Sequence, residues 1–217
     1  MKILSAILVA IIITGGYYLL VHVIDKKYEL NFHKKKICII DKTVIWFGVF
    51  TLIGSGVTGY FRLSHMVMPQ AILTVVIICA MAVLAILDKC KNIVPNKILL
   101  IMLGIWVAVV GVYILLDIMG GIALFAKSLM GGIVGGITFL MCYLLSGKKV
   151  GAGDVKLSFV MGLFLTGDRI IGAIFYGTLV CCIYSIILLF RKKIGLKDGV
   201  PMVPFLYIGV LITLFII

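Results

Sequence analysis

The chain has 217 residues, of which 64% are hydrophobic and only 13% are charged, and its formal net charge is +12. A soluble domain is nearer half apolar with about a quarter of its residues charged, so this composition excludes a soluble globular protein. Nucleic-acid binding is also disfavoured, because it would need a soluble platform for the basic residues, whereas membrane topology and attraction to anionic lipid explain the positive charge.

Apolar runs follow one another along the whole chain, and a helix of about 20 residues crosses about 30 Å of hydrocarbon. We predict eight membrane spans, of which the sixth and the eighth are short, near residues 3–24, 44–61, 70–87, 98–116, 128–146, 155–167, 170–190 and 202–217. The first run is longer than the apolar region of a signal peptide, and no small-residue cleavage site follows it. The sequence therefore predicts an all-α, polytopic membrane protein.

Lysine and arginine predict how these spans are oriented. Four connections are strongly basic and together carry fifteen of the twenty lysine and arginine residues, namely 25–43, 88–97, 146–154 and 191–200. Basic connections are retained in the cytoplasm, so these four are expected to face it. The opposite connections carry only Arg62, Lys127 and Arg169.

Two carboxylates stand at the ends of predicted spans on this cytoplasmic side. Asp88 ends the apolar run 71–87, and Asp154 precedes the run 155–167. A charge this close to hydrocarbon is costly and points to a function. Each acid also has a structural alternative, because Asp88 can be a helix-end residue, although a carboxylate there opposes the helix dipole, and Asp154 can be a helix N-cap.

Glycine on each side of Ala152 gives Asp154 an unusual setting. Gly151 and Gly153 lack a Cβ, so they permit positive φ and close approach of another backbone, such as that of an extended peptide. Two carboxylates that share a site do not both ionise easily, so one holds a proton while the other is charged. The charged one can deprotonate water and the protonated one can polarise a scissile carbonyl, which predicts peptide hydrolysis without a metal.

Three motifs, which follow one another along the chain in the family's order, resemble those of the prepilin peptidase family, whose members are membrane aspartyl proteases of type IV pilus, competence and related secretion systems. Gly-Ala-Gly-Asp-Val-Lys-Leu at 151–157 resembles the family's GxGD motif. Asp88, followed seven residues later by Pro95 and Asn96, resembles its first aspartate motif. Val-Pro-Met-Val-Pro-Phe-Leu at 200–206 is similar to its proline-rich start of the last span.

The resemblance implies an endopeptidase that cuts the short leader of prepilin-like or pseudopilin-like proteins at the cytoplasmic face of the bacterial inner membrane. It makes Asp88 and Asp154 the catalytic pair. Residues expected to position the substrate or the backbone are Gly151, Gly153, Lys156, Pro95, Asn96 and Pro204. Lys156 lies two residues from Asp154 and would point to another helix face, so we interpret it as a lipid or substrate contact. Residues 70–217 would then be the peptidase core, and residues 1–69 an N-terminal pair of spans with a basic loop.

The cysteines depart from the pattern of many bacterial members, which bind zinc through two Cys-x-x-Cys pairs and also methylate the new amino terminus. Here the first basic loop contains Cys38 alone, and a tetrahedral thiolate site needs four suitably spaced ligands. We therefore expect no zinc and no cofactor, which puts methyl transfer in doubt. Substrate protein and membrane lipid are the expected partners, and the oligomeric state stays undetermined.

Small residues recur on the predicted fifth span at Gly131, Gly132, Gly135 and Gly136, a pattern that favours close helix packing in membranes.

Three other functions stay open at this point. A presenilin-like intramembrane protease shares the GxGD motif, but its usual Tyr-Asp is absent because Leu87 precedes Asp88. A small proton-coupled transporter would also use intramembrane acids, although both acids lie at one face and no paired half-helices are evident. A noncatalytic assembly factor would not need the aspartate pair.

Overall fold

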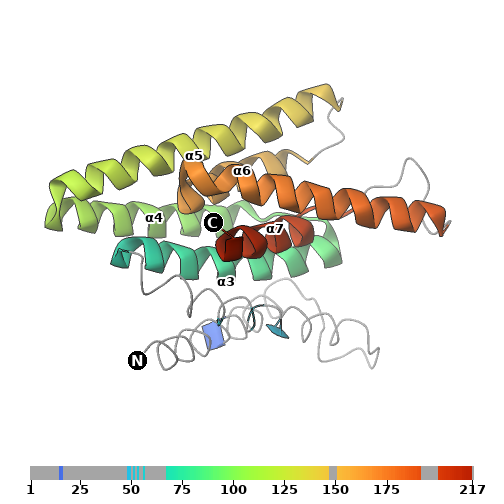
Figure 1. The fold of residues 1–217 in the computed structure, drawn as a ribbon, viewed down its shortest axis with the longest axis horizontal. Helices are drawn as coiled ribbons and strands as arrows, with labels where there is room; N and C mark the ends of the chain where they lie inside the picture. Colours follow the sequence, from blue (N-terminus) through green and yellow to red (C-terminus); the bar gives the residue numbers. More distant parts are fainter. Residues whose placement is uncertain are drawn as a thin grey trace.

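In the computed structural model, residues 67–146, 151–191 and 200–216 are described, together with a few isolated positions before residue 57. All regular structure in these ranges is helical, and five helices follow in order: α3 (Met68–Lys91), α4 (Asn96–Leu116), α5 (Ile118–Leu145), α6 (Ala152–Phe190) and α7 (Val203–Ile216) (Figure 1). The predicted spans 3–24 and 44–61 and the basic loop between them lie almost wholly outside the described residues.

The helices follow the predicted spans closely, with two differences. Four of them, α3 to α6, are long and apolar enough to cross a membrane, as expected of a multi-pass membrane protein, whereas α7 has only 14 residues. The described residues do not confirm the count of eight spans. The predicted spans 155–167 and 170–190 are joined as α6, which contains one break at Thr166 (φ 67°, ψ 170°).

The start of α5 was predicted wrongly. We predicted that this span begins at residue 128 and that Lys127 lies in the connection before it. The helix instead begins at Ile118, where the Asp117 side chain accepts a hydrogen bond from the Gly120 amide (3.1 Å). A capped start and the apolar residues that follow it extend the helix through a single lysine, whose side chain stays exposed.

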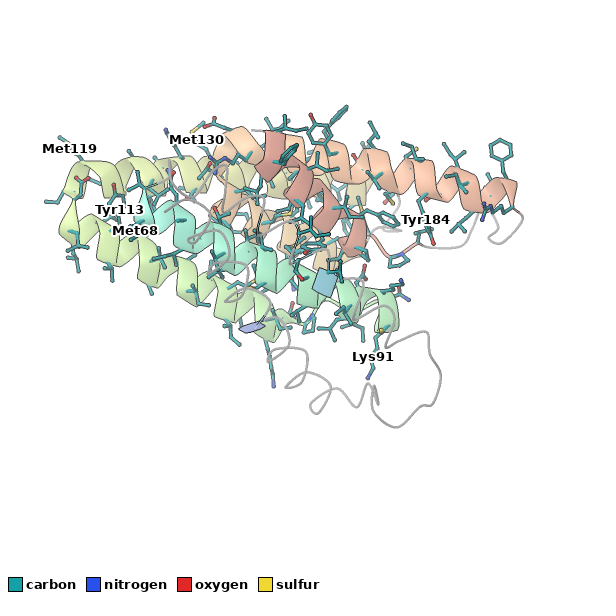
Figure 2. All side chains as sticks on the ribbon, turned by 60° about the horizontal axis from the view of Figure 1, so that its bottom comes forward. Met68, Lys91, Tyr113, Met119, Met130 and Tyr184 are labelled. Atoms are coloured by element: carbon teal, nitrogen blue, oxygen red, sulfur yellow. The ribbon has the colours of Figure 1, made fainter. Side chains whose placement is uncertain are left out.

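Successive helices run in alternating directions, and α6 folds back on itself at its break (Figure 1). The Lys91 end of α3 therefore lies at the end of the bundle opposite Met68, Tyr113 and Met119 (Figure 2). This arrangement brings the C-terminal end of α3 together with the N-terminal ends of α4, α6 and α7.

Glycine allows α5 and the first part of α6, residues 152–165, to pack with their backbones in contact. A Cβ at Gly131 would overlap the backbone at Gly162 and Thr166, and a Cβ at Gly162 would overlap the backbone of Gly131. One turn away, Gly135 lies against Ser158, whose hydroxyl donates a hydrogen bond to the Gly135 carbonyl (2.9 Å). The expectation that this glycine pattern serves close packing is confirmed.

The core of the bundle centres on α3, whose residues 81–88 are all buried. The part of α6 after Thr166 packs along α7, where Gly177 lies against Leu206 and Gly209 against Ala173. By contrast, α4 exposes many large apolar side chains, such as Leu100, Ile101 and Val107, as expected of a surface that faces lipid.

Candidate active site

Asp88 lies in the last turn of α3 and is 6% exposed. The helix ends at Asn92, which adopts the left-handed conformation (φ 52°) and donates its amide to the Asp88 carbonyl (2.8 Å). Asparagine tolerates this conformation better than most residues, so it suits a helix C-cap. The local sequence thus stops α3 one turn after its acid.

Asp154 lies in the first turn of α6, close to Asp88. The N-cap is Gly151, and the Asp154 amide donates to its carbonyl (3.0 Å), so the alternative that Asp154 is itself the N-cap is wrong. The Asp154 carboxyl interacts electrostatically with Asp88. The structure therefore brings together the two acids that the sequence paired.

The start of α7 completes the surroundings of Asp88. The Val203 amide donates a hydrogen bond to Asp88 Oδ2 (3.0 Å), and the Met202 amide adds a second backbone interaction with the same carboxyl group. Pro204 is buried at the second position of α7, where a missing N–H costs no helix hydrogen bond. Asp88 is thus unfavourably placed for the dipole of α3 but favourably placed for that of α7.

Both glycines of the GxGD motif have close neighbours. A Cβ at Gly153 would lie 3.2 Å from the Cβ of Val94, which belongs to the loop after Asp88. A Cβ at Gly151 would lie 3.2 Å from Asp154 Oδ2. Gly151 itself has φ −68°, which any residue can adopt, so the positive φ that glycine permits is not used there. Close approach is what glycine provides at both positions.

Comparison with known families bears directly on this arrangement. The sequence model of the type IV leader peptidase family matches residues 75–186, about half of the chain. The chain belongs to the type IV leader peptidase family. The matched part of the chain contains both aspartates and the GxGD glycines, whereas the start of α7, with Val203 and Pro204, lies outside it. No curated protein and no solved structure matches the chain.

A second contact joins the two aspartate motifs. Lys156 Nζ donates to Asn96 Oδ1 at 3.4 Å on the exposed side of the site. Pro95 is buried just before α4, and its carbonyl accepts from the Ile98 amide (3.1 Å), which fixes the start of that helix. The side-chain partner of Lys156 is therefore Asn96, and its role as a substrate or lipid contact stays a prediction.

An apolar cavity of about 670 Å³ begins beside these two residues. It runs between α4, α5 and the first part of α6, and its walls include Asn96, Leu99, Leu103, Ile137, Lys156 and Phe159. Sequence reasoning missed it, because no single stretch of the chain forms it. The acid pair is thus next to a space that accepts apolar side chains.

Metal ligands do not gather anywhere in the described part of the chain. Within residues 67–146, 151–191 and 200–216, no group of three or more His, Cys, Asp or Glu side chains could hold an ion. Cys90 is exposed two residues after Asp88, and Cys38 lies outside the described residues. The expectation of no zinc site stays a prediction.

Proposed function

We propose that this chain is an aspartyl endopeptidase that removes the short leader of prepilin-like proteins, with Asp88 and Asp154 as its catalytic pair. The family supports a peptidase with prepilin-like substrates. The observation that carries the aspartyl mechanism is the meeting of two carboxyl groups from the ends of α3 and α6, one buried and both beside helix N-termini.

The surroundings of the two acids support a division of roles. Backbone amides of Met202 and Val203 interact with Asp88, whereas Asp154 has one such partner, Gly151. Hydrogen bonds from amides favour the charged form of a carboxyl group. We therefore assign the negative charge to Asp88 and the shared proton to Asp154.

Hydrolysis then proceeds through a tetrahedral intermediate. Asp88 takes a proton from water as its oxygen attacks the scissile carbonyl carbon, and Asp154 gives its proton to the carbonyl oxygen. When the intermediate collapses, the C–N bond breaks and Asp88 returns a proton to the leaving amine. Asp154 recovers its proton from the hydroxyl group that becomes the new carboxyl group, so the pair ends as it began.

The amide of Val203 offers a direct test of the role of α7. Val203→Pro removes the N–H at the first position of the helix, where proline is well tolerated. Because a hydrogen bond to a charged group contributes about 1.5–3 kcal/mol, we expect kcat to fall about tenfold or more and the melting temperature to fall as well, with KM nearly unchanged. Val203→Ala keeps the amide and should leave kcat unchanged. A proline variant with normal kcat would show that α7 does not position Asp88.

The central experiment is leader cleavage by the purified full-length chain. A prepilin-like protein with a short basic leader is the substrate, and mass spectrometry of the product gives the new amino terminus. We expect a single cut before the apolar segment, and no effect of EDTA, because two carboxylates need no metal. An uncleaved substrate would refute the proposal. Loss of cleavage on chelation with recovery on adding zinc would refute its metal-free mechanism.

We also propose that the acid pair faces the cytoplasm of a bacterial cell. Lysine and arginine concentrate on the connections at the Asp88 end of the bundle, which supports this orientation. Single cysteines placed at Lys193 and at Arg62, in a chain without its own cysteines, test it. In intact cells, an impermeant thiol reagent should label only the cysteine at residue 62, and labelling at residue 193 would reverse the topology.

A further inference from the structure

A second cavity, which unlike the first is lined by polar residues, lies at the end of the bundle opposite the acid pair. Its volume is about 220 Å³, and it is partly enclosed by three helices. Its polar wall consists of Gln70, Thr74, Lys127, Thr166, Asp168 and Arg169. None of these residues belongs to the proposed active site, so this far recess, as we name the cavity, needs its own explanation.

Lys127 is the first feature to explain. It is the only charged residue in the 28 residues of α5, and charges inside apolar spans are costly and usually functional. Among the residues that the structure describes, Lys127 makes no hydrogen bond and no ion pair. A cation so placed, on the wall of a polar cavity, is suited to bind an anion.

The break in α6 is the second feature. Thr166 has φ 67° and ψ 170°, a backbone region that is almost restricted to glycine and costs about 1–3 kcal/mol. The turn places Asp168 and Arg169 on the wall of the far recess, which Lys127 from α5 also lines. Irregular backbone at membrane depth persists where it lines a polar cavity, which agrees with the position of this break.

From these features we infer that the far recess binds the phosphate of an anionic phospholipid head group. Lys127 and Arg169 against Asp168 leave one net positive charge, which matches the single negative charge of such a head group. The Gln70 amide and the Thr166 hydroxyl are further donors on the same wall.

The exposed surface beside the far recess favours a lipid over a free anion. Met130 follows Lys127 by three residues and Ile171 follows Asp168 by three, so each lies on the same helix face as its charged neighbour. Their side chains are 62% and 61% exposed, and Figure 2 shows Met130 on the outer surface of the bundle. An acyl chain can cover these apolar side chains while the head group occupies the recess.

The test is binding of short-chain phosphatidylglycerol to the full-length chain in detergent, measured by native mass spectrometry. We expect Lys127→Gln and Arg169→Gln each to raise Kd about tenfold, since each removes a charge-assisted hydrogen bond. Asp168→Asn removes a repulsion and should lower Kd. Arg191→Gln, which replaces an exposed arginine at the C-cap of α6, should leave Kd unchanged. The site is independent of peptidase activity, so its failure and that of the proposed function are distinguishable.

Several results would overturn the inference. Equal Kd values for wild type, Lys127→Gln and Arg169→Gln would show that no such site exists. Protection of the wild type against heat by inorganic phosphate, lost in Lys127→Gln, would identify a free anion as the ligand. Equal binding of phosphatidylethanolamine, weakened by Asp168→Asn, would identify a zwitterionic head group. If Arg169→Gln does not fold, Lys127→Gln and Asp168→Asn decide the question through their opposite effects.

Discussion

Asp88→Asn and Asp154→Asn should each reduce leader cleavage by about 10³-fold or more, while the protein still folds and inserts. General acid–base groups contribute about 10²–10⁴-fold to a rate, and loss of either carboxyl group leaves the other without its partner in proton transfer. Asparagine keeps an oxygen that can accept the Val203 hydrogen bond, so the contact between α3 and α7 should survive in Asp88→Asn.

The measurement is the rate of leader release from a prepilin-like substrate by each purified variant, with melting temperature as the test of folding. Asp117→Asn and Asp168→Asn are matched controls at the other end of the bundle, and both should cleave normally. Asparagine is as good an N-cap as aspartate, so α5 should keep its start in Asp117→Asn. Full processing by either active-site variant would refute the assignment of the pair.

Gly162→Ala should cause the largest loss of stability of any single methyl group added to a described helix. The new Cβ would overlap the backbone of Gly131, which cannot turn aside as a flexible side chain can. Overpacking of this kind costs about 1–3 kcal/mol or more, so α5 and α6 must separate. Cleavage should fall as well, because Asp154 lies on the same part of α6, two turns away.

Thermal unfolding in detergent provides the measurement, and the lipid-facing helix α4 provides the control. A Cβ at Gly104 has no atom within 4 Å, and alanine has the higher helix propensity, so Gly104→Ala should be neutral or slightly stabilising. If Gly162→Ala and Gly104→Ala melt at the same temperature, the close contact between α5 and α6 does not stabilise this protein.

Hydropathy predicted the described helices well, but it could not predict their ends. The start of α5 was missed because Lys127 interrupts the apolar pattern. The helix nevertheless begins at Ile118, where the Asp117 side chain caps it, and hydropathy does not detect a cap made by one side chain. The predicted spans 155–167 and 170–190 met at the right place. However, the sequence does not show that Thr166 there adopts a conformation typical of glycine.

The candidate site was predictable where side chains carry the chemistry and unpredictable where backbone does. Asp88 and Asp154 stood out because isolated acids beside apolar runs are costly. The amide of Val203 left no trace in the sequence, since every residue except proline has one. Gly162 was also missed. Its partner in α5, Gly131, belongs to a recurring glycine pattern, whereas Gly162 is an isolated glycine in α6.

The hydrogen bond from Val203 to Asp88 also determines at what stage of protein synthesis the candidate site can be complete. Asp88 and Asp154 are synthesised first, and the amide that holds Asp88 belongs to a helix that follows them in the chain. At a translation rate of about 5–20 residues per second, the ribosome adds the residues between Asp154 and Val203 in roughly 2–10 s. Throughout that interval the chain contains both acids but not yet the amide that bonds Asp88. If Asp88 and Asp154 act as proposed, the active site is complete only when α7 docks, after both acids have been synthesised.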